Sequence, residues 1–571
     1  MTTDEARPSP RPPDIALFAG IDPALVSELL WTLPVRTFAA GEYLCHEGEP
    51  GSSMFILRRG LARVVIGPDE TSVRRLRRGD VVGEMSMLTN DPRTASVIAS
   101  VPTEVLELDR NRFASTLSTH PELLSNLTRI LSERLARTTQ SGRTSTRGEA
   151  IALVVGEGLE HVAAAVIDAV ETSSPANVAS IDLRVGPQEA GDRLEEALST
   201  LDDLLAANRT VTIVTPADFG LLDLLTLHTD RTLVLTHEDE ADVLVKQVAP
   251  DASLTEVVLV DAEVPAGVTL NGVPVIRTIW SDDERHARWV GRHLARTKIG
   301  LALGAGGAKG YAHVGALRVL EQAGYEIDYV SGSSIGAVVG VCVALGMDSL
   351  EIEAMLLRLF TPDNVKELFT LSFAGTSTGG DTMKAMLSGL TDDKTFADLR
   401  LPMTVMTVDL GAREPEPIMS GPLLDALLAA TALAGFVPPF KRGEQRLIDA
   451  LALVPVPSEA VRTAGADVTI SVNIMSRDVL DAWPGQEPPE TVTKRERMLD
   501  TLLEVMDLGQ LDASIRSAAA ADVPITPVFG PATWRDFELA DLFLEAGTLA
   551  TTDALDAIAE LVRPSLPPTP A

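Results

Sequence analysis

Apolar and polar positions follow three different rhythms along the chain, and each change of rhythm indicates a separate domain. In the first rhythm, short apolar runs alternate with glycine-containing turns, which is typical of a small β domain. Strands are expected at 54–57, 61–66 and 73–76, and flanking helices at 23–31 and 111–135. The N-terminal part is therefore predicted to form a β-roll with flanking helices.

From residue 150 onward, strand-like runs alternate with helix-like stretches. The expected strands are 151–155, 178–185, 210–214, 231–235 and 256–260, and the expected helices are 188–207 and 282–298. Such alternation favours a mainly parallel sheet covered by helices. Gly156 and Gly158 complete neither a Walker loop nor a dinucleotide fingerprint. We assign this middle α/β domain no ligand and expect it to act as a spacer or coupling element.

A third rhythm begins at Ile299 with a strand at 299–303, a helix from Tyr311, a strand at 327–330 and a helix at 335–345. Further on we expect a strand at 404–409, a helix at 423–432 and a last strand at 467–474. Closing helices are expected at 498–520, 534–547 and 553–562. The apolar stretches 355–360 and 368–373 are read either as core helices or as a lipid-facing lid.

These patterns predict three domains, at 14–138, 150–298 and 299–562. Residues 1–13 and 563–571 are rich in proline and are expected to be tails. Residues 139–149 are polar and are expected to be a linker. The fold class is multidomain α/β.

The most informative stretch is Gly-Ser-Ser-Ile-Gly at 332–336, where an apolar strand turns into an apolar helix. This is the nucleophile-elbow pattern, with Ser334 as the nucleophile. Gly332 and Gly336 are needed because a Cβ at either position would collide with the neighbouring strand or helix. The helix N-terminus behind Ser334 offers unpaired N–H groups and a positive partial charge.

Upstream of the elbow, residues 304–310 read Gly-Ala-Gly-Gly-Ala-Lys-Gly between a strand and a helix. Such a loop exposes consecutive N–H groups as an anion-binding nest. It is not a Walker loop, since no Ser or Thr follows Lys309. A nest followed by a serine elbow is what acyl transfer needs, because the donors can hold a tetrahedral oxyanion. The motif residues are Gly304, Gly306, Gly307, Ala308, Lys309 and Gly310, with the oxyanion donors expected at Gly306, Gly307 and Ala308.

Another candidate site lies in the first domain, at 79–88 and 92–96. Gly83 allows close backbone approach, and a short helix from Glu84 can present its N-terminal amides to an anion. Arg93 can pair with a cyclic phosphate through two parallel hydrogen bonds, and Glu84 can accept from a ribose hydroxyl. The centre of this candidate site is therefore Gly83, Glu84 and Arg93.

This stretch resembles the phosphate-binding cassette of cyclic nucleotide-binding domains, although Val82 stands where the family usually has Phe. By this resemblance the binding set is Gly83, Glu84, Ser86, Arg93, Thr94 and Ser96, in which Thr94 adds a phosphate contact and a hydroxyl at Ser96 favours guanine. The ligand that the resemblance implies is cAMP or cGMP. The alternative is a degenerate domain of the same fold that binds nothing.

Nest, elbow and the residues around them resemble the patatin-like phospholipases, and the arrangement with a front domain is similar to the neuropathy target esterase family. That resemblance implies a Ser–Asp dyad and no catalytic cofactor or metal. By the same resemblance Asp449 is the candidate base, because it comes shortly after Phe-Val-Pro-Pro at 436–439. Ala450 and Leu451 replace the two family glycines, and Ala450 would be strained if the turn required a positive φ.

Other side chains compete for the role of base. Asp425 falls within a helical pattern, and Asp409 at a strand end is read as a structural turn residue. His313 is the sole histidine of the hydrolase segment and is expected to pack or hydrogen-bond after the nest, since a triad needs a base that reaches the nucleophile.

Composition limits the partners. A formal net charge of -33 argues against nucleic acid as a partner of the whole chain. The two cysteines, Cys45 and Cys342, form no disulfide framework, and no apolar run approaches the ~20 residues that span a bilayer. We expect a cytoplasmic protein, at most peripheral at the inner face of the membrane.

Two functional hypotheses remain. The first is a serine lipolytic hydrolase (a lysophospholipase, phospholipase or carboxylesterase) regulated by cyclic nucleotide. The second is a catalytically impaired patatin-fold protein that senses cyclic nucleotide, which the Ala450-Leu451 departure motivates. A transcription regulator is excluded because no helix-turn-helix pattern follows the front domain.

Overall fold

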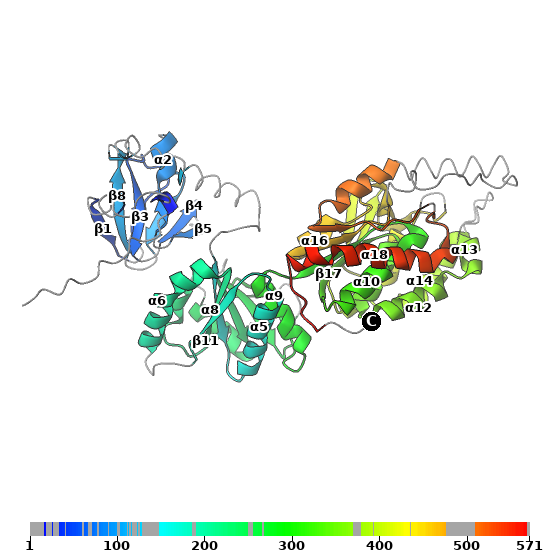
Figure 1. Ribbon diagram of the computed structural model, residues 1–571, viewed down its shortest axis with the longest axis horizontal. Coiled ribbons are helices and arrows are strands. Elements are labelled where there is room, and N and C mark those ends of the chain that lie inside the picture. The colour runs from blue at the N-terminus through cyan, green and yellow to red at the C-terminus, as the bar shows by residue number, and fades with distance from the viewer. Residues whose placement is uncertain are drawn as a thin grey trace, which may run out of the picture. The chain divides into compact units, whose positions relative to one another are not determined.

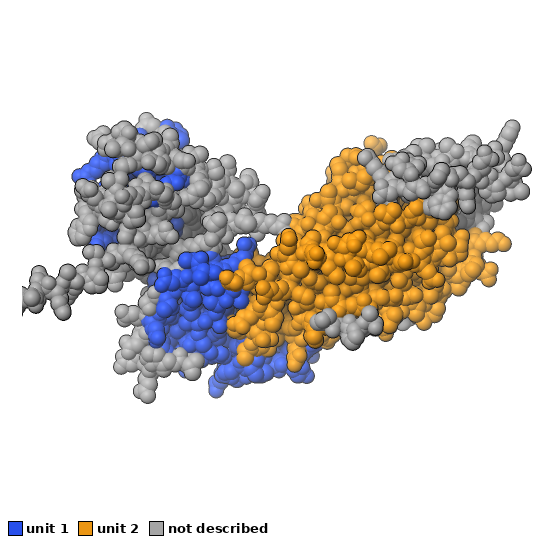
Figure 2. All heavy atoms as spheres, in the orientation of Figure 1, with its two compact units in different colours: residues 1–163, 178–283 blue, residues 164–177, 284–571 orange. Residues whose placement is uncertain are grey.

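The computed structural model of the chain divides into two compact units, coloured separately in Figure 2. Unit 1 comprises residues 1–163 and 178–283, and unit 2 comprises residues 164–177 and 284–571. The structure describes residues 16–18, 26, 33–39, 42–59, 62–66, 71–76, 79–89, 91–99, 103–110, 112–113, 116, 123, 126–127, 148–184, 190–248, 255–264, 268–368, 378–391, 393–433, 436–475, 509–530 and 532–567. The predicted N-terminal tail, nearly all of the predicted linker and most of the helices predicted at 23–31 and 111–135 lie outside the described residues.

The N-terminal part of unit 1 contains two four-stranded antiparallel sheets, in the orders β1-β8-β3-β6 and β2-β7-β4-β5. Phe55 and Val105 of the first sheet share one buried cluster with Ala62 and Val97 of the second, so the sheets pack face to face. The elements are η1 (Ala16–Phe18), β1 (Val35–Phe38), β2 (Tyr43–Cys45), β3 (Ser53–Arg59), β4 (Ala62–Ile66), β5 (Thr71–Leu76), β6 (Val81–Val82), α2 (Glu84–Thr89), β7 (Ser96–Ala99) and β8 (Thr103–Asp109).

The middle part of unit 1 is a seven-stranded sheet in the order β10-β11-β9-β12-β13-β15-β14. Its neighbours pair in parallel except for β14 at the edge, so the prediction of a mainly parallel sheet is confirmed. The elements are β9 (Glu149–Val155), α5 (Glu160–Ser173), β10 (Val178–Asp182), α6 (Ala190–Ala207), β11 (Thr210–Pro216), α7 (Leu222–Leu227), β12 (Arg231–Thr236), α8 (Glu238–Val248), β13 (Thr255–Val260), β14 (Thr269–Leu270) and β15 (Val273–Ile279). Helices α5 and α8 and strand β15 had no counterpart in the sequence prediction.

Unit 2 is built on an eight-stranded sheet in the order β20-β21-β18-β17-β16-β22-β23, with β19 also paired to β18. Figure 1 labels β17 of this sheet together with helices of the same unit, among them α10, α16 and α18. Its central strands are parallel, and their carboxyl ends meet at one edge. The strands are β16 (Ile299–Leu303), β17 (Ile327–Ser333), β18 (Met403–Asp409), β19 (Glu414–Ile418), β20 (Phe440–Arg442), β21 (Gln445–Asp449), β22 (Val468–Val472) and β23 (Val523–Ile525). Because β23 extends the sheet beyond β22, the prediction that 467–474 was the last strand is wrong.

Helices cover this sheet, and α10 packs along α18. They are α9 (Glu284–Ala295), η3 (Gly307–Gly310), α10 (Tyr311–Gln322), α11 (Ile335–Leu345), α12 (Ser349–Leu359), α13 (Pro362–Leu368), α14 (Thr378–Thr391), η4 (Phe396–Asp398), α15 (Leu423–Ala430), η5 (Ala450–Ala452), α16 (Ser458–Ala464), η7 (Phe537–Leu539) and α18 (Ala540–Ala559), with a further helical stretch at 509–518. The two closing helices predicted at 534–547 and 553–562 are one continuous helix, α18, which runs through Gly547. A Cβ at Gly547 would lie 2.0 Å from the carbonyl oxygen of Ala312, so this glycine lets α18 approach α10 closely.

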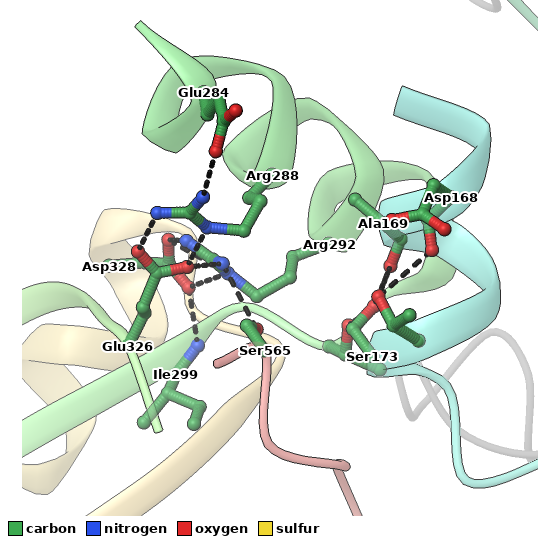
Figure 3. A network of polar contacts seen from close by, with 12 residues as sticks. Asp168, Ala169, Ser173, Glu284, Arg288, Arg292, Ile299, Glu326, Asp328 and Ser565 are labelled. Atoms are coloured by element: carbon green, nitrogen blue, oxygen red, sulfur yellow. Dashed lines mark hydrogen bonds and ion pairs between the residues drawn. The ribbon is translucent and has the colours of Figure 1, made fainter. Parts of the chain in front are cut away.

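Helix α9 and the C-terminal segment are joined by a buried polar network, drawn in Figure 3. Arg292 of α9 is 3% exposed and binds Asp328 of β17 at 2.7 Å and Glu326 at 2.6 Å. Asp328 also accepts from the amide of Ile299 at 2.9 Å. Ser565 contributes its hydroxyl to Arg292 at 3.2 Å. Two sequence predictions are corrected here: α9 was assigned to the middle domain, and residues from 563 were expected to form a tail.

In the part of the chain that the structure describes, no helix combines the length and the apolar character needed to cross a bilayer.

Candidate active site

Ser334 stands between β17 and α11, at the carboxyl edge of the unit 2 sheet. Its backbone has φ 56° and ψ −124°, a strained conformation that a non-glycine residue rarely adopts. A Cβ on Gly332 would lie 2.3 Å from the carbonyl oxygen of Gly336, and one on Gly336 would lie 2.2 Å from that of Leu303. The tight elbow therefore depends on both glycines, and it lifts Ser334 above the sheet.

Asp449 ends β21 and reaches the same place through the register of the sheet. Ser333, just before the nucleophile, is paired with Met406 of β18. The next residue of β18, Thr407, is paired with Asp449 on its other side. Ser334 and Asp449 therefore come to either side of Thr407 in the sheet.

The carboxylate of Asp449 is 4% exposed. Burial raises the pKa of this carboxyl to about 6, while hydrogen bonding from the Ser334 hydroxyl and the Leu451 amide opposes the rise. The Leu451 amide donates to Oδ1 at 2.9 Å. Within the described part of the chain, Oδ2 has no hydrogen bond of ordinary geometry. The Ser334 hydroxyl is thus near enough to lower the pKa of the carboxyl group, although the contact is looser than an ordinary hydrogen bond. Loose contacts between catalytic groups are common before substrate binds.

The turn after Asp449 does not need glycine. Asp449 is the N-cap of the short helix η5, and neither Ala450 nor Leu451 has a positive φ. The strain expected at Ala450 is therefore absent, because this chain follows Asp449 with a 3₁₀ turn rather than a left-handed one.

The nest follows β16 and is fixed by backbone hydrogen bonds at both ends. The amide of Gly304 donates to Val472, and that of Ala305 donates to Pro455 at 2.9 Å. The amide of Ala308, predicted as an oxyanion donor, donates instead to the carbonyl of Trp534 at 2.7 Å.

Three amides remain for an oxyanion. Those of Gly306 and Gly307 make no backbone hydrogen bond among the described residues. Ile335 begins α11, so its amide is one of the first-turn N–H groups that a helix leaves without an internal acceptor. Gly307 has φ +55°, and a Cβ there would lie 2.5 Å from the Trp534 carbonyl oxygen, so only glycine fits this close approach.

Exposure picks out the same residues. Between Ile299 and Tyr311, every residue is buried except Gly306 and Gly307, which are partly exposed. Between Asp328 and Ala344, every residue is buried except Ser334. The surface is therefore open where a reacting ester would have to meet both the nucleophile and the nest.

His313 lies on α10 and is completely buried. Its Nε2 is 2.8 Å from the carbonyl oxygen of Gly304. Burial lowers the pKa of His313 to about 4, so the ring is neutral near pH 7. Since a carbonyl can only accept, Nε2 carries the proton and Nδ1 is left without a partner among the described residues. His313 is therefore a packed residue that donates a hydrogen bond to Gly304, the first residue of the nest.

The remaining candidates from the sequence lie elsewhere or serve the structure. Asp409 accepts from the amide of Gly411 at 2.8 Å, which makes it the turn residue that was predicted. Asp425 is exposed in the first turn of α15. The ammonium of Lys309 lies 5.1 Å above the ring of Phe529, which suits a buried nest-flanking residue.

The cassette predicted in the first domain brings Gly83, Glu84 and Arg93 together. Gly83 has φ +85°, and Glu84 opens the six-residue helix α2 and is 2% exposed. Arg93 is buried and donates to the carbonyl oxygens of Gly83 at 3.0 Å and Ser53 at 2.5 Å. These bonds take two of the five N–H donors of its guanidinium, so donors remain for a phosphate.

Three further cassette residues surround this centre. Ser86 is buried and packs against Gly51: a Cβ added to Gly51 would lie 2.2 Å from the Cβ of Ser86. Thr94 is exposed, and Ser96 is partly exposed and accepts from the amide of Glu47 at 2.9 Å. The charge and the backbone of the cassette fit an anionic ligand.

Comparison with protein-family models finds two matches. Residues 35–120 match the model of the cyclic nucleotide-binding domain. Residues 301–460 match that of the patatin-like phospholipases, and this span includes nest, elbow and Asp449. The chain joins a cyclic nucleotide-binding domain to a patatin-like phospholipase domain.

Curated relatives are named after the NTE family or after a patatin-like phospholipase domain. An NTE family protein of Mycobacterium tuberculosis (strain CDC 1551 / Oshkosh) is 26% identical over 99% of this chain and 100% of its own length. Patatin-like phospholipase domain-containing protein 7 of Rattus norvegicus is 24% identical over 80% of this chain and 39% of its own length. Among solved structures, one titled "Sp-2Cl-cAMPS bound to PKAR CBD2" is 25% identical over 23% of this chain and 88% of that chain, with a TM-score of 0.20.

Sequence reasoning missed several residues around the patatin-like site. The carbonyl of Trp534 accepts from the Ala308 amide of the nest. Trp534 lies far from the nest in sequence, and no local motif predicts this contact. Ser331 and Ser333 of β17 were not considered, although serines at alternate positions of a buried strand are unusual and need partners.

Proposed function

We propose that the patatin-like domain hydrolyses carboxylic esters of lipids, of the lysophospholipase or phospholipase type, through a Ser334–Asp449 dyad. The observation that carries the proposal is exposure: Ser334 and the amides of Gly306 and Gly307 are the open points of otherwise buried segments. A nucleophile and oxyanion donors that reach the same opening are what acyl transfer requires.

In this mechanism Asp449 accepts the proton of Ser334 Oγ as that oxygen attacks the ester carbonyl carbon. The amides of Gly306, Gly307 and Ile335 hold the tetrahedral oxyanion. The intermediate then expels the alcohol, which takes the proton from Asp449 and leaves an acyl ester on Ser334. Asp449 next takes a proton from water, the hydroxide attacks the acyl ester, and the fatty acid leaves as Ser334 regains its proton.

Fluorophosphonate labelling tests this directly, because the reagent reacts with an activated serine. Wild-type protein is expected to be labelled at Ser334, located by peptide mass spectrometry, and Ser334→Ala is expected to remain unlabelled. Ser471→Ala is the control: it removes a serine hydroxyl from the same sheet, but one that is fully buried, whereas Ser334 is partly exposed. Wild-type protein that takes up no label while binding cyclic nucleotide would favour the impaired sensor over the hydrolase.

The Ala450–Leu451 sequence no longer supports that alternative, since Asp449 keeps its place through the Leu451 amide. The sensor hypothesis would therefore need a negative result in the labelling experiment to support it.

We also propose that cAMP or cGMP binds the first domain and regulates the hydrolase. Arg93, buried beside Gly83 and close to Glu84 in sequence, supplies the cation for the cyclic phosphate. Isothermal titration calorimetry with each nucleotide tests binding, and Arg93→Lys, which keeps the charge without the planar fork, is expected to weaken it. If neither nucleotide gives heat at concentrations well above micromolar, regulation by these ligands is wrong and the hydrolase proposal stands unaffected.

A further inference from the structure

The segment that follows the base also contacts the nucleophile's strand and the nest. After Asp449, the amides of Leu453 and Val454 donate to the carbonyl of Ala450 at 3.0 and 2.8 Å and close the η5 turn. Residues 454–457, here called the bridging segment, then lead into α16. Their position is consequently tied to the position of Asp449 by a short, hydrogen-bonded turn.

Two serines of β17 bind the bridging segment. The hydroxyl of Ser333 donates to the carbonyl of Val454 at 2.7 Å, and that of Ser331 donates to the carbonyl of Pro457 at 2.8 Å. Both side chains are completely buried. Residues two apart on a strand point to the same face, so the two hydroxyls form a pair of parallel attachments.

The nest is attached to the same segment. The amide of Ala305 donates to the carbonyl of Pro455 at 2.9 Å. Val456 is 1% exposed, and its methyl group would lie 3.1 Å from a Cβ on Gly304. The bridging segment therefore connects the three parts of the site: base, nucleophile strand and oxyanion nest.

We propose that Ser333 is a positioning residue that sets the separation of Ser334 and Asp449 through its bond to Val454. This role rests on the proposed function and belongs to the first of the two positions that the Gly-x-Ser-x-Gly pattern leaves open. Ser333 immediately precedes the nucleophile, and Val454 closes the turn that follows the base. Its hydroxyl therefore links the strand that carries the nucleophile directly to the turn that follows the base. A loss of this link lets the turn shift, and a shift of about 1 Å can reduce the rate on the order of a hundredfold.

The test compares three variants, Ser333→Ala, Ser333→Cys and Ser471→Ala. Cysteine is slightly larger than serine and leaves no cavity, but it is a poor hydrogen-bond donor, so it separates the loss of the hydrogen bond from the creation of a cavity. Ser471 is an equally buried strand serine, whose hydroxyl donates to Ala518 at 3.0 Å rather than to the bridging segment. Fluorophosphonate labelling rate, kcat and KM on a soluble ester, thermal midpoint and the acid limb of kcat/KM against pH are measured for each.

Both Ser333 variants are expected to lose at least about tenfold in labelling rate and kcat, with KM nearly unchanged. The acid limb should move below pH 6, because a loosened turn admits water and lowers the pKa of Asp449 toward its ordinary value. Ser471→Ala should lose thermal stability without either change. If Ser333→Ala fails to fold, Ser331→Ala replaces it with the same expected direction.

The inference is overturned if the Ser333 variants label as fast as Ser471→Ala with an unmoved acid limb. It is also overturned if cysteine restores the wild-type rate, since the cavity alone would then explain the alanine result. Wild-type protein without label at Ser334 would instead overturn the proposed function, so the two failures are distinguishable.

Discussion

The amide of Leu451 donates to the carboxylate of Asp449 at 2.9 Å. This bond occupies Oδ1 and leaves Oδ2 for the nucleophile. It also makes the turn after the base self-supporting, although the two residues that form it are alanine and leucine where related proteins are expected to have glycine.

Restoring the glycines should therefore not improve the enzyme. The double variant Ala450→Gly/Leu451→Gly is expected to label no faster than wild type. It should lose roughly 0.5–1 kcal/mol of stability per glycine, because glycine gains more freedom in the unfolded chain. Labelling rate and thermal midpoint check this, and a clear gain in rate would mean that the present turn misplaces Asp449.

Activity should depend on pH through Asp449. The base works only when ionised, and burial raises its pKa to about 6. We expect kcat/KM to rise through pH 6 and reach a plateau above pH 7. An acid limb near pH 4, the ordinary value for a carboxyl group, would contradict the assignment of this buried base.

Replacing Asp449 by asparagine should stabilise the fold while it stops the chemistry. The folded protein binds a proton at Asp449 more tightly than the unfolded chain, so stability falls as pH rises from about 4 to about 6. An asparagine side chain at this position would carry no charge and could still accept from Leu451. Asp449→Asn is therefore expected to gain on the order of 1 to 3 kcal/mol above pH 7 and much less near pH 4. Thermal melts at both pH values, with labelling as the activity readout, check this prediction.

The nest and the serine elbow could be recognised from the sequence because both motifs are local. Strand, glycine nest, helix, strand and serine elbow follow one another within residues 299–345, so spacing alone orders them. The prediction erred on Ala308, whose amide is taken by Trp534, a residue more than two hundred positions later that no local pattern connects to the nest.

Long-range contacts also account for the errors in the fold. Residues from 563 onward look like a tail because they are rich in proline, yet the amides of Ser565 and Leu566 donate to Gly324. Strand β23 is only three residues long, and its pairing with β22 is not visible in its composition.

His313 offers a test of the nest itself. Its Nε2–H holds the carbonyl of Gly304. His313→Ala is expected to lower kcat about tenfold, because the nest loses its first anchor and an oxyanion donor shifts. His313→Gln places an amide N–H near the same point and should recover much of the rate. Equal kcat for both variants at equal thermal stability would limit His313 to packing.

The buried network on α9 predicts a large effect on stability. Arg292→Met leaves Asp328 and Glu326 without their buried partner, which typically costs about 3–5 kcal/mol. Arg288→Met is the matched control, since Arg288 also binds Glu326 but is more exposed. Thermal inactivation of labelling should shift strongly for the first variant and weakly for the second. Similar shifts would mean that the Arg292–Asp328 pair contributes little.

The unit that contains the patatin-like site is formed by two separate pieces of the chain. Residues 164–177 and 284–571 form one unit, and residues 178–283 belong to the other. A fragment cut at residue 299, where the catalytic motifs begin, would discard Arg292 and Ser173, whose carbonyl accepts from the amide of Arg563. A contiguous fragment that keeps this unit whole must therefore also include residues 178–283, which form most of the middle sheet domain.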